Sequence, residues 1–405
     1  MKRSLTLLAL LFATLAVTAQ WTQKQSMYDY GRSNAVSCFA NGRCYAGLGE
    51  LPDGSYSSDF WQFDTLANRW TRLPDYPGSG LYESSCFVIQ GMVYVGLGFS
   101  EAHACAADLW RFNPGPGLWT RMADFPDLPR YGAETFVIGD SAFVVGGSHN
   151  DGFNYHTEMY MYSPATGTWK QKAPFPGGKR SVGTAFALGG YGYFGMGNSN
   201  SFASQSDLWR YDPVADAWSQ VASFPGTERC GAVCFTSAGR EMVGFGCDAE
   251  EVGIYSDAYV YNPNEDSWQV LNPLVSLPGR AHAMSFSTGI SGFVAGGFDL
   301  QGKFTDLWEL PGSLMLSVDD APEALSPAIR LYPNPAGRFV TISRNAAGTA
   351  RYHLSLSALD GKIILSDQVS MAESYRLELP ALPKGIYLLR LSSETEDFSG
   401  KVVIE

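Results

Sequence analysis

The stretch that decides the fold begins at Arg180 and runs through residue 221; it reads RSVGTAFALGGYGYFGMGNSNSFASQSDLWRYDPVADAWSQV. Phe186 stands eleven residues before Gly197, which ends an apolar segment, and Asp207-Leu208-Trp209 and Trp218 follow. Aromatic segments separated by glycine-rich or polar turns are typical of short β-strands. We predict four strands here, called a to d in chain order: a contains the phenylalanine, b ends at the glycine, c holds Asp-x-Trp, and d begins at the isolated tryptophan.

The same landmarks return along the chain with a period of about fifty residues. Six apolar segments end at glycines spaced by 49, 49, 50, 49 and 51 residues, namely Gly49, Gly98, Gly147, Gly197, Gly246 and Gly297. An acidic residue followed by an aromatic keeps the same phase, at Asp59, Asp108, Glu158, Asp207, Asp257 and Asp306. Such a period is typical of a β-propeller, in which each repeat is one four-stranded blade. We predict an all-β protein whose main domain is a six-bladed β-propeller.

The sixth repeat lacks a strand d of its own, because the pattern stops soon after Trp308. Trp21 lies eleven residues before Arg32, and the later tryptophans Trp70, Trp119, Trp169 and Trp218 precede the next strand a by the same distance. We therefore expect the N-terminal strand to complete the last blade. Closure of this kind removes exposed sheet edges, which is why a ring of blades is stable.

Composition and the N-terminus predict an exported protein. Lys2 and Arg3 precede an apolar segment from Leu5 to Val17, and small residues follow, so residues 1–19 are expected to be a signal peptide rather than a membrane span. The net charge of −12 disfavours nucleic acid as a partner, since phosphate binding needs a cationic surface. Seven cysteines permit disulfides in such a chain but cannot all pair.

Residues 20–312, taken as the propeller, resemble the kelch family in their period, their glycines and their tyrosine or tryptophan landmarks. One feature departs from the family pattern. The usual diglycine survives at Gly146-Gly147 and Gly296-Gly297, whereas the first glycine is replaced elsewhere by Leu48, Leu97, Met196 and Phe245. A glycine one position earlier, as at Gly47, is expected to restore the close approach of the backbones.

After a polar linker at residues 313–327, residues 328–405 are expected to form a small β-sandwich domain. Alternation in Tyr352-His353-Leu354-Ser355-Leu356 predicts a half-buried strand. The segment Tyr332-Pro333-Asn334-Pro335, the turn Asp360-Gly361-Lys362 and Lys384-Gly385-Ile386-Tyr387 resemble the C-terminal sorting domain of the Bacteroidetes type IX secretion system (Por secretion). The resemblance implies passage through the periplasm, handling by the type IX machinery, and a final place outside the cell or on its surface. An ordinary fibronectin-like module is the alternative.

Strand parity places the d–a and b–c connections at one end of the propeller, and the b–c connections are the longer ones. Ligand contacts are therefore expected on this face. Arginines stand at the start of strand a in five repeats, at Arg32, Arg130, Arg180, Arg229 and Arg280, while Leu81 takes the place in the second. They would form a cationic funnel suited to a carboxylate or sulfate. The alternative is structural: buried arginines that bond loop carbonyls and neighbouring acids such as Glu134.

The same face carries Tyr82, Tyr131, His149 and His282, which we predict as further ligand contacts because exposed aromatic rings suit carbohydrate or protein recognition. Neither a metal nor another cofactor is expected, since no two histidines have ligand spacing on one regular element. Cys230 and Cys247 should fall opposite each other at the ends of paired strands a and b, which makes them the disulfide candidate.

Two functions remain open on this evidence. The first is a non-enzymatic binding protein, secreted or displayed on the cell surface, that recognises a glycan or protein ligand through the d–a/b–c face. The second is an enzyme resembling the six-bladed sialic acid mutarotases, acting on a carboxylated sugar held by residues such as Arg130 and Glu134. A carboxylate and a histidine converging in a deep channel would favour the enzyme. Arginines paired to local acids would favour binding.

Overall fold

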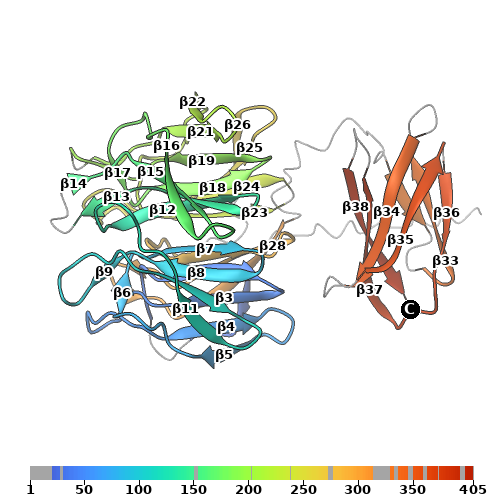
Figure 1. Ribbon diagram of the computed structural model, residues 1–405, viewed down its shortest axis with the longest axis horizontal. Helices are drawn as coiled ribbons and strands as arrows, with labels where there is room; N and C mark the ends of the chain where they lie inside the picture. Colours follow the sequence, from blue (N-terminus) through green and yellow to red (C-terminus); the bar gives the residue numbers. More distant parts are fainter. Residues whose placement is uncertain are drawn as a thin grey trace, which may run out of the picture. The chain divides into compact units, whose positions relative to one another are not determined.

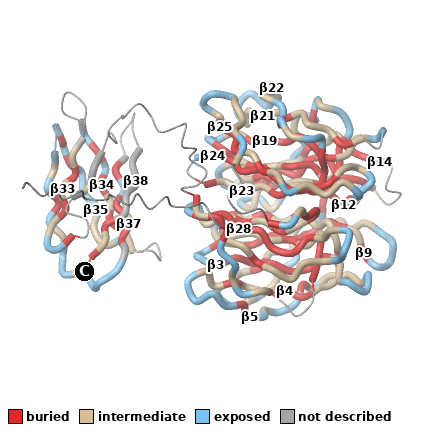
Figure 2. The backbone as a smooth tube through the Cα atoms, turned by 180° about the vertical axis from the view of Figure 1, so that it is seen from behind, coloured by how far each residue is buried: buried red, intermediate tan, exposed pale blue. Residues whose placement is uncertain are grey.

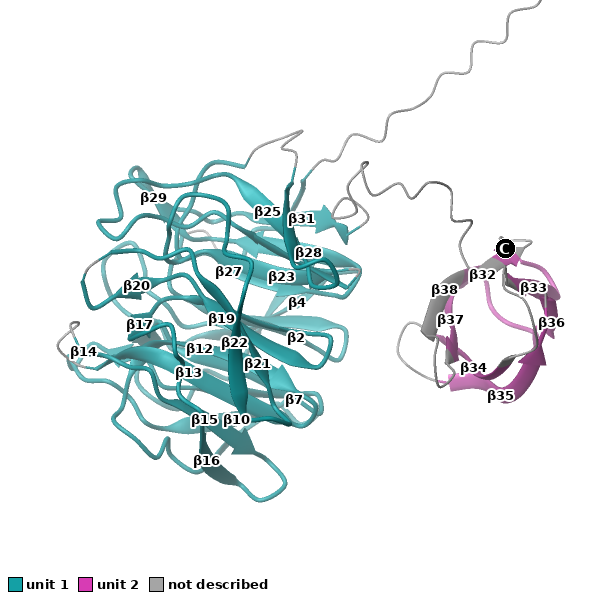
Figure 3. Ribbon diagram, turned by 90° about the horizontal axis from the view of Figure 1, so that it is seen from above, with its two compact units in different colours: residues 1–317 teal, residues 318–405 magenta. Residues whose placement is uncertain are grey.

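The computed structural model describes residues 21–27, 31–149, 154–201, 203–237, 239–271, 277–312, 329–332, 336–344, 350–358, 363–372, 374–392 and 397–404. Two compact units divide the chain at residues 317 and 318 (Figure 3). Within these residues the named secondary-structure elements are all strands, as predicted (Figure 1). Among the described residues no helix is long and apolar enough to cross a membrane. The predicted signal peptide at residues 1–19 and the linker at 313–327 lie outside the described residues.

The first unit contains six sheets built on one antiparallel plan, with strands in the order a, b, c, d. We call them blades 1 to 6. Blades 1 to 3 comprise β2 (Val36–Ala40), β3 (Arg43–Gly47), β4 (Phe60–Asp64) and β5 (Arg69–Leu73); β7 (Ser85–Ile89), β8 (Met92–Gly96), β10 (Leu109–Asn113) and β11 (Leu118–Arg121); and β12 (Tyr131–Ile138), β13 (Ser141–His149), β15 (Met159–Ser163) and β16 (Thr168–Lys172).

Blades 4 to 6 repeat the plan. They comprise β18 (Thr184–Leu188), β19 (Tyr191–Gly195), β21 (Leu208–Asp212) and β22 (Ala217–Val221); β23 (Val233–Ser237), β24 (Arg240–Gly244), β25 (Ala258–Asn262) and β26 (Ser267–Val270); and β27 (Met284–Ser287), β28 (Ser291–Ala295), β31 (Leu307–Pro311) and β1 (Thr22–Lys24). The long b–c connections also form short pairs. β9 (Phe99–Ser100) and β20 (Asn198–Ser199) pair with β6 (Leu81–Tyr82) and β17 (Arg180–Ser181), which lie on the d–a connections; β14 (Asn154–Tyr155) pairs with β13; and β29 (Phe298–Asp299) pairs with β30 (Gly302–Lys303) within one b–c connection.

The N-terminal strand occupies the place of the strand d that the sixth repeat lacks. β1 pairs with β31 in the register Thr22 to Glu309 and Lys24 to Leu307, and Lys24 Nζ lies 2.6 Å from Glu309 Oε2. Trp21 packs in the core beside Phe245. This pairing is the one that a ring closed by its own N-terminus requires, because it covers the outer edge of β31.

A continuous belt of backbone hydrogen bonds joins the starts of all six strands a. In each blade one residue of left-handed conformation donates its N–H to the carbonyl of its counterpart in the preceding blade, with distances from 2.9 to 3.3 Å. The last bond runs from Asn34 N to His282 O, so the belt returns on itself. We call the six residues the inner ring: Asn34, Glu83, Gly132, Val182, Gly231 and His282.

The core of the first unit lies between neighbouring blades, where the faces of strands b and c meet the next sheet. Buried residues concentrate along these inner strands and exposed ones on the outer strands and turns (Figure 2). The isolated tryptophans tie each blade to the preceding one: Trp119 Nε1 donates to Pro74 O and Trp218 Nε1 to Ala173 O, both at 3.0 Å. A partly or fully buried aromatic ring whose N–H has an acceptor, present in five blades, explains why tryptophan recurs there.

The second unit contains a three-stranded and a four-stranded sheet around one apolar core (Figure 3). The sheets are β32 (Ile329–Tyr332), β33 (Phe339–Arg344) and β36 (Ser374–Glu378), and β35 (Ile363–Met371), β34 (Ala350–Ala358), β37 (Gly385–Ser392) and β38 (Asp397–Ile404). Tyr352, Leu354 and Leu356 are buried, and alternate residues of β34 therefore face the core, as the sequence pattern predicts.

Candidate functional site

The five arginines at the start of strand a are buried and paired with acids. Each guanidinium bonds the carbonyl that ends strand b in its own blade; Arg280 Nη1, for example, donates to Gly296 O at 3.1 Å. In four blades it also bonds the acidic residue of strand c, as Arg280 does to both oxygens of Asp306 at 2.7 and 3.0 Å. The other three such pairs are Arg32 with Asp59, Arg180 with Asp207, and Arg229 with Asp257. In the remaining blade Arg130 pairs with Asp127, which precedes it in the chain.

This arrangement favours the structural alternative over an open cationic funnel. The five arginines are at most 1% exposed, and two aromatic rings cover Arg229. Burial opposes ionisation of Asp59, but the hydrogen bonds and charge of Arg32 prevail and hold the pKa of Asp59 below its usual value. A guanidinium already bonded to a carboxylate and a carbonyl has few donors left for a ligand.

The residues that replace the first glycine of the diglycine have a positive φ, of 57° at Leu48 and 59° at Phe245. This conformation turns their carbonyls toward the arginine, and Phe245 O accepts from Arg229 Nη1 at 2.8 Å. The glycine one position earlier is the one that close approach requires: a Cβ at Gly47 would lie 2.2 Å from Asp59 O. The compensation expected from the sequence is therefore present.

The six strands a line a central channel with a cavity of about 290 Å³. Small side chains such as Ala133, Ala185 and Ser285 face it. Glu83 and Glu134 also line it, and burial together with the negative charge of Glu83 raises the pKa of Glu134 to about 8. The channel therefore contains a carboxyl group whose ionisation is disfavoured.

A larger cavity of about 600 Å³ opens where the inner ring meets the b–c connections; we call it the mouth pocket. Four tyrosines line it, and Tyr82 is central among them, with its ring centroid 4.8 Å from that of Tyr56 and 5.6 Å from that of Tyr131. The polar and charged lining residues are Asn34, Glu50, Glu83, Ser148, Ser181, Asn198, Glu251, His282, Asp299 and Lys303.

Negative charge dominates the mouth pocket. Lys303 Nζ lies 3.0 Å from Glu50 Oε2 and donates to Leu51 O at 2.8 Å. His282 stands between two acids, with Nδ1 3.8 Å from Glu83 Oε1 and Nε2 3.4 Å from Glu251 Oε1. Among the described residues, every cationic side chain that lines the pocket therefore already has an acidic neighbour.

Glu83 and His282 have strongly shifted pKa values. Burial raises the pKa of Glu83 to about 7, although the neighbouring His282 works in the opposite direction. Burial opposes protonation of His282, but contacts with Cys230 and Glu251 and the charge of Glu83 outweigh it and raise the pKa of His282 to about 10. Within the described residues Glu83 Oε2 and Asn34 Oδ1 are buried without a hydrogen-bond partner. Both are available to a ligand in the pocket.

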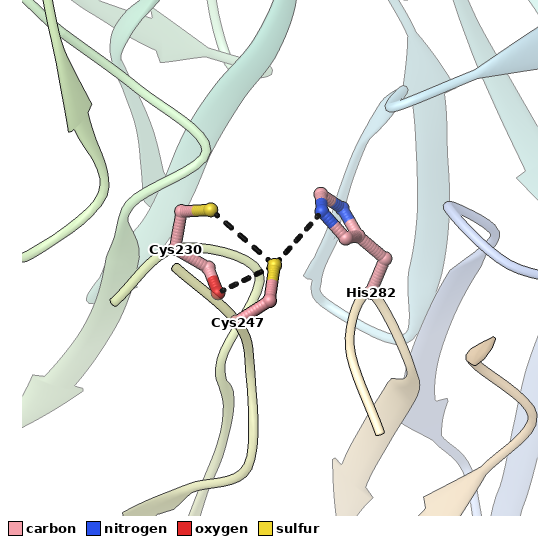
Figure 4. A group of neighbouring side chains, drawn as sticks. All are labelled: Cys230, Cys247 and His282. Carbon is pink, nitrogen blue, oxygen red and sulfur yellow. Dashed lines mark hydrogen bonds between the residues drawn. The ribbon is translucent and has the colours of Figure 1, made fainter. Parts of the chain in front are cut away.

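Cys230, just before strand a of blade 5, lies opposite Cys247, just after strand b of the same blade, with two backbone hydrogen bonds between them. This placement is the one that the sequence predicts. Both side chains are thiols, and their sulfur atoms are 3.5 Å apart. His282 of blade 6 completes the cluster, with Nε2 3.9 Å from Cys247 Sγ (Figure 4).

The structure brings together only part of the predicted site. Tyr82, Tyr131 and His282 line the mouth pocket, whereas His149 Nδ1 lies 2.6 Å from Pro129 O and is not among the lining residues. Sequence analysis missed Tyr56 and Glu251. It also overlooked one usable signal: the inner ring is a repeat position at which the side chain differs in almost every blade.

Comparison with known families identifies both units. The family model "KLHDC2/KLHL20/DRC7 Kelch-repeats domain" matches residues 49–232, and the model "Secretion system C-terminal sorting domain" matches residues 330–405. This is a kelch-repeat protein with a secretion sorting domain. Kelch repeats and a sorting tail together indicate an interaction module that the type IX system exports, to the cell surface or beyond it.

Solved structures agree on the fold of this kelch-repeat protein. The structure titled "Structure of YjhT" superposes with a TM-score of 0.60 at 17% identity, over 70% of this chain and 96% of that chain. At this identity the match shows a shared propeller-type fold. No curated protein sequence matches the chain.

Proposed function

We propose that this kelch-repeat protein is an exported glycan-binding protein and that its ligand occupies the mouth pocket. The single observation that carries the proposal is the combination of four tyrosine rings with unpartnered acceptors in one cavity of about 600 Å³. Tyrosine offers an apolar face for a sugar ring and a hydroxyl for its substituents. Glu83 and Asn34 add buried acceptors for sugar hydroxyls.

The charge of the pocket supports a neutral or amino-bearing glycan rather than a carboxylated one. The arginines that a carboxylate would need are buried in their own ion pairs. Lys303 is next to Glu50, and His282 is next to Glu83 and Glu251. An added carboxylate would meet four acids, of which Glu83 already carries a raised pKa, so its binding would be repelled.

A glycan array probed with the exported chain, signal peptide removed, tests the proposal. We expect neutral or amino-bearing glycans to bind and Tyr82→Ala to weaken the best of them by about tenfold or more, since that ring lies at the centre of the aromatic lining. Tyr191→Ala is the matched control, because Tyr191 begins β19 at the turn on the opposite face. Binding restricted to carboxylated glycans, or equal loss in both variants, would refute the proposal.

A second candidate function rests on Glu83 and His282 and applies to the chain without a metal ion on His282. A carboxyl of pKa about 7 that lies 3.8 Å from a protonated histidine can exchange protons with a sugar. Mutarotation needs one proton acceptor at the anomeric hydroxyl and one donor at the ring oxygen, which these groups provide. Faster anomer exchange of a bound sugar, lost in Glu83→Gln while sugar binding persists, would support this activity. No acceleration over buffer leaves binding as the function.

A further inference from the structure

The two thiols and the imidazole described above converge from two blades on one buried point. Cys230 precedes strand a and Cys247 follows strand b in blade 5, where they face each other, and His282 comes from the inner ring of blade 6. Their ligand atoms all lie within 4.8 Å of one another, and Figure 4 shows the three side chains directed toward a common centre. The residues are 2%, 0% and 8% exposed.

We propose that Cys230, Cys247 and His282 form a binding site for one divalent metal ion of the zinc class, which links blade 5 to blade 6 beside the mouth pocket, with Glu251 as the nearest further ligand. The site goes beyond glycan binding because it concerns a different ligand, held by two thiols that do not line the mouth pocket. Two soft thiolates with one imidazole select zinc or a similar thiophilic ion over magnesium or calcium.

The distances between ligand atoms are those of a tetrahedral site. With zinc–sulfur and zinc–nitrogen bonds of about 2.3 and 2.05 Å, a tetrahedron has sulfur–sulfur and sulfur–nitrogen edges of about 3.7 and 3.6 Å. The Cys230 and Cys247 sulfurs are 3.5 Å apart, and Cys247 Sγ is 3.9 Å from His282 Nε2. These two edges are within about 0.4 Å of the ideal values, and the third, from Cys230 Sγ to His282 Nε2, is within 4.8 Å.

Glu251 is the nearest acid to these three residues. Its Oε1 lies 3.4 Å from His282 Nε2, the same nitrogen that faces Cys247, but the carboxylate is outside the group of atoms within 4.8 Å of one another and would have to move closer to the sulfurs to provide a fourth ligand. The loop is held in place by Asp248, whose carboxylate accepts the N–H groups of Val252 and Gly253 at 3.0 and 2.9 Å.

The surroundings of His282 complete the pattern of a metal-bound histidine. Its second nitrogen, Nδ1, faces Glu83 Oε1 at 3.8 Å. A carboxylate on the far side of a ligating imidazole orients the ring and raises its basicity.

A disulfide between Cys230 and Cys247 is the competing fate of these thiols in an exported chain. It would shorten the sulfur–sulfur distance from 3.5 Å to about 2.05 Å and remove both thiolate ligands. The two states exclude each other, so a test must control the redox state and count thiols.

Titration of the exported chain with Co²⁺ under a thiol reductant, followed by competition with Zn²⁺, tests the proposal. We expect one ion per chain, with a thiolate-to-cobalt charge-transfer band and intense visible bands of tetrahedral cobalt. Cys230→Ser and Cys247→Ser should each lower the charge-transfer intensity in proportion to the thiolates removed. His282→Ala and Glu251→Gln should keep that band but weaken the affinity by about tenfold or more.

Cys234→Ser is the matched control: Cys234 lies in the same blade, and Ser285 occupies its position in blade 6. It should bind cobalt as the unaltered chain does. Circular dichroism of each variant checks that the fold is retained. The proposal fails if a chain with all seven thiols free takes up no cobalt, if Cys230→Ser and Cys247→Ser leave the bands unchanged, or if the disulfide persists under reductant.

Discussion

Two sets of repeat positions surround the channel of the propeller, and they differ in what repeats. The arginines of strand a keep both their side chain and their bonds in five of the six blades. The inner ring keeps its backbone bonds in all six blades but changes its side chain, from Asn34 and Glu83 to Gly132. Repetition of a side chain therefore indicates a structural role, and the candidate functional groups lie where the backbone repeats and the side chain does not.

We expect the largest loss of stability when one of the repeated arginines is removed. Arg280→Ala should lower the free energy of unfolding by about 3 to 5 kcal/mol, because it removes the fully buried cationic partner of the largely buried Asp306. The exposed pair of Arg72 with Asp75 offers the control, and Arg72→Ala should cost less than about 1 kcal/mol. Urea unfolding followed by tryptophan fluorescence measures both. Similar losses would mean that burial of the repeated arginines contributes little.

The second effect concerns Glu241, a buried acid where neighbouring blades place small or apolar residues. Burial raises the pKa of Glu241 to about 8, whereas an unfolded glutamate titrates near 4.5. The folded chain therefore holds a proton that the unfolded chain loses, and stability declines as the pH rises from about 4.5 to 8. Glu241→Gln should flatten this slope and raise the free energy of unfolding at pH 8 by about 2 kcal/mol.

The control for this pH effect is Glu228→Gln, a substitution of an exposed acid that precedes Arg229. Thermal unfolding of the three proteins between pH 4 and 9 gives the comparison. A slope that survives in Glu241→Gln would assign the pH dependence to Glu83 and Glu134 instead, and would contradict the prediction for Glu241.

A smaller loss of stability is expected in blade 3, where the repeated arginine has a different acidic partner. In blade 3 Arg130 pairs with Asp127, three residues earlier in the chain, because Glu158 bonds His156 instead. Asp127 is 27% exposed and Asp306 is 17% exposed, so water can replace part of the lost contact at Asp127. Asp127→Asn should therefore destabilise the chain by about 1 kcal/mol less than Asp306→Asn in urea unfolding. The reverse order would contradict this ranking.

The smallest expected effect tests the inner ring as a backbone motif. Val182 has a φ of 53°, a conformation unfavourable for a β-branched residue. Val182→Gly relieves this strain but loses side-chain packing against Cys230 and Ala281, so the net change should stay below about 1 kcal/mol. Val233→Gly, at a buried strand position, should cost clearly more. Equal losses in calorimetry would show that the side chain of Val182 matters as much as that of a core residue.

Much of the propeller could be predicted because its repeats can be aligned with one another, which shows the equivalent positions. Trp21 indicated the strand that pairs with β31, and the glycines at Gly49 and Gly297 lie two residues after the ends of β3 and β28. The arginines were harder to interpret. Their recurrence is visible in the sequence, but the difference between an open funnel and buried pairs depends on whether Asp257 and Asp306 reach them across some 27 residues.

The sequence by itself determined the strand pattern, the period and the sorting domain, because each depends on residues close together in the chain. Only the tertiary structure decided that His282 stands beside Cys230 and Cys247, and that Glu83 faces it from another blade. These residues are separated by up to about 200 positions and come from different repeats. Their meeting depends on how blades curve into a ring, a property of packed sheets that no single repeat contains.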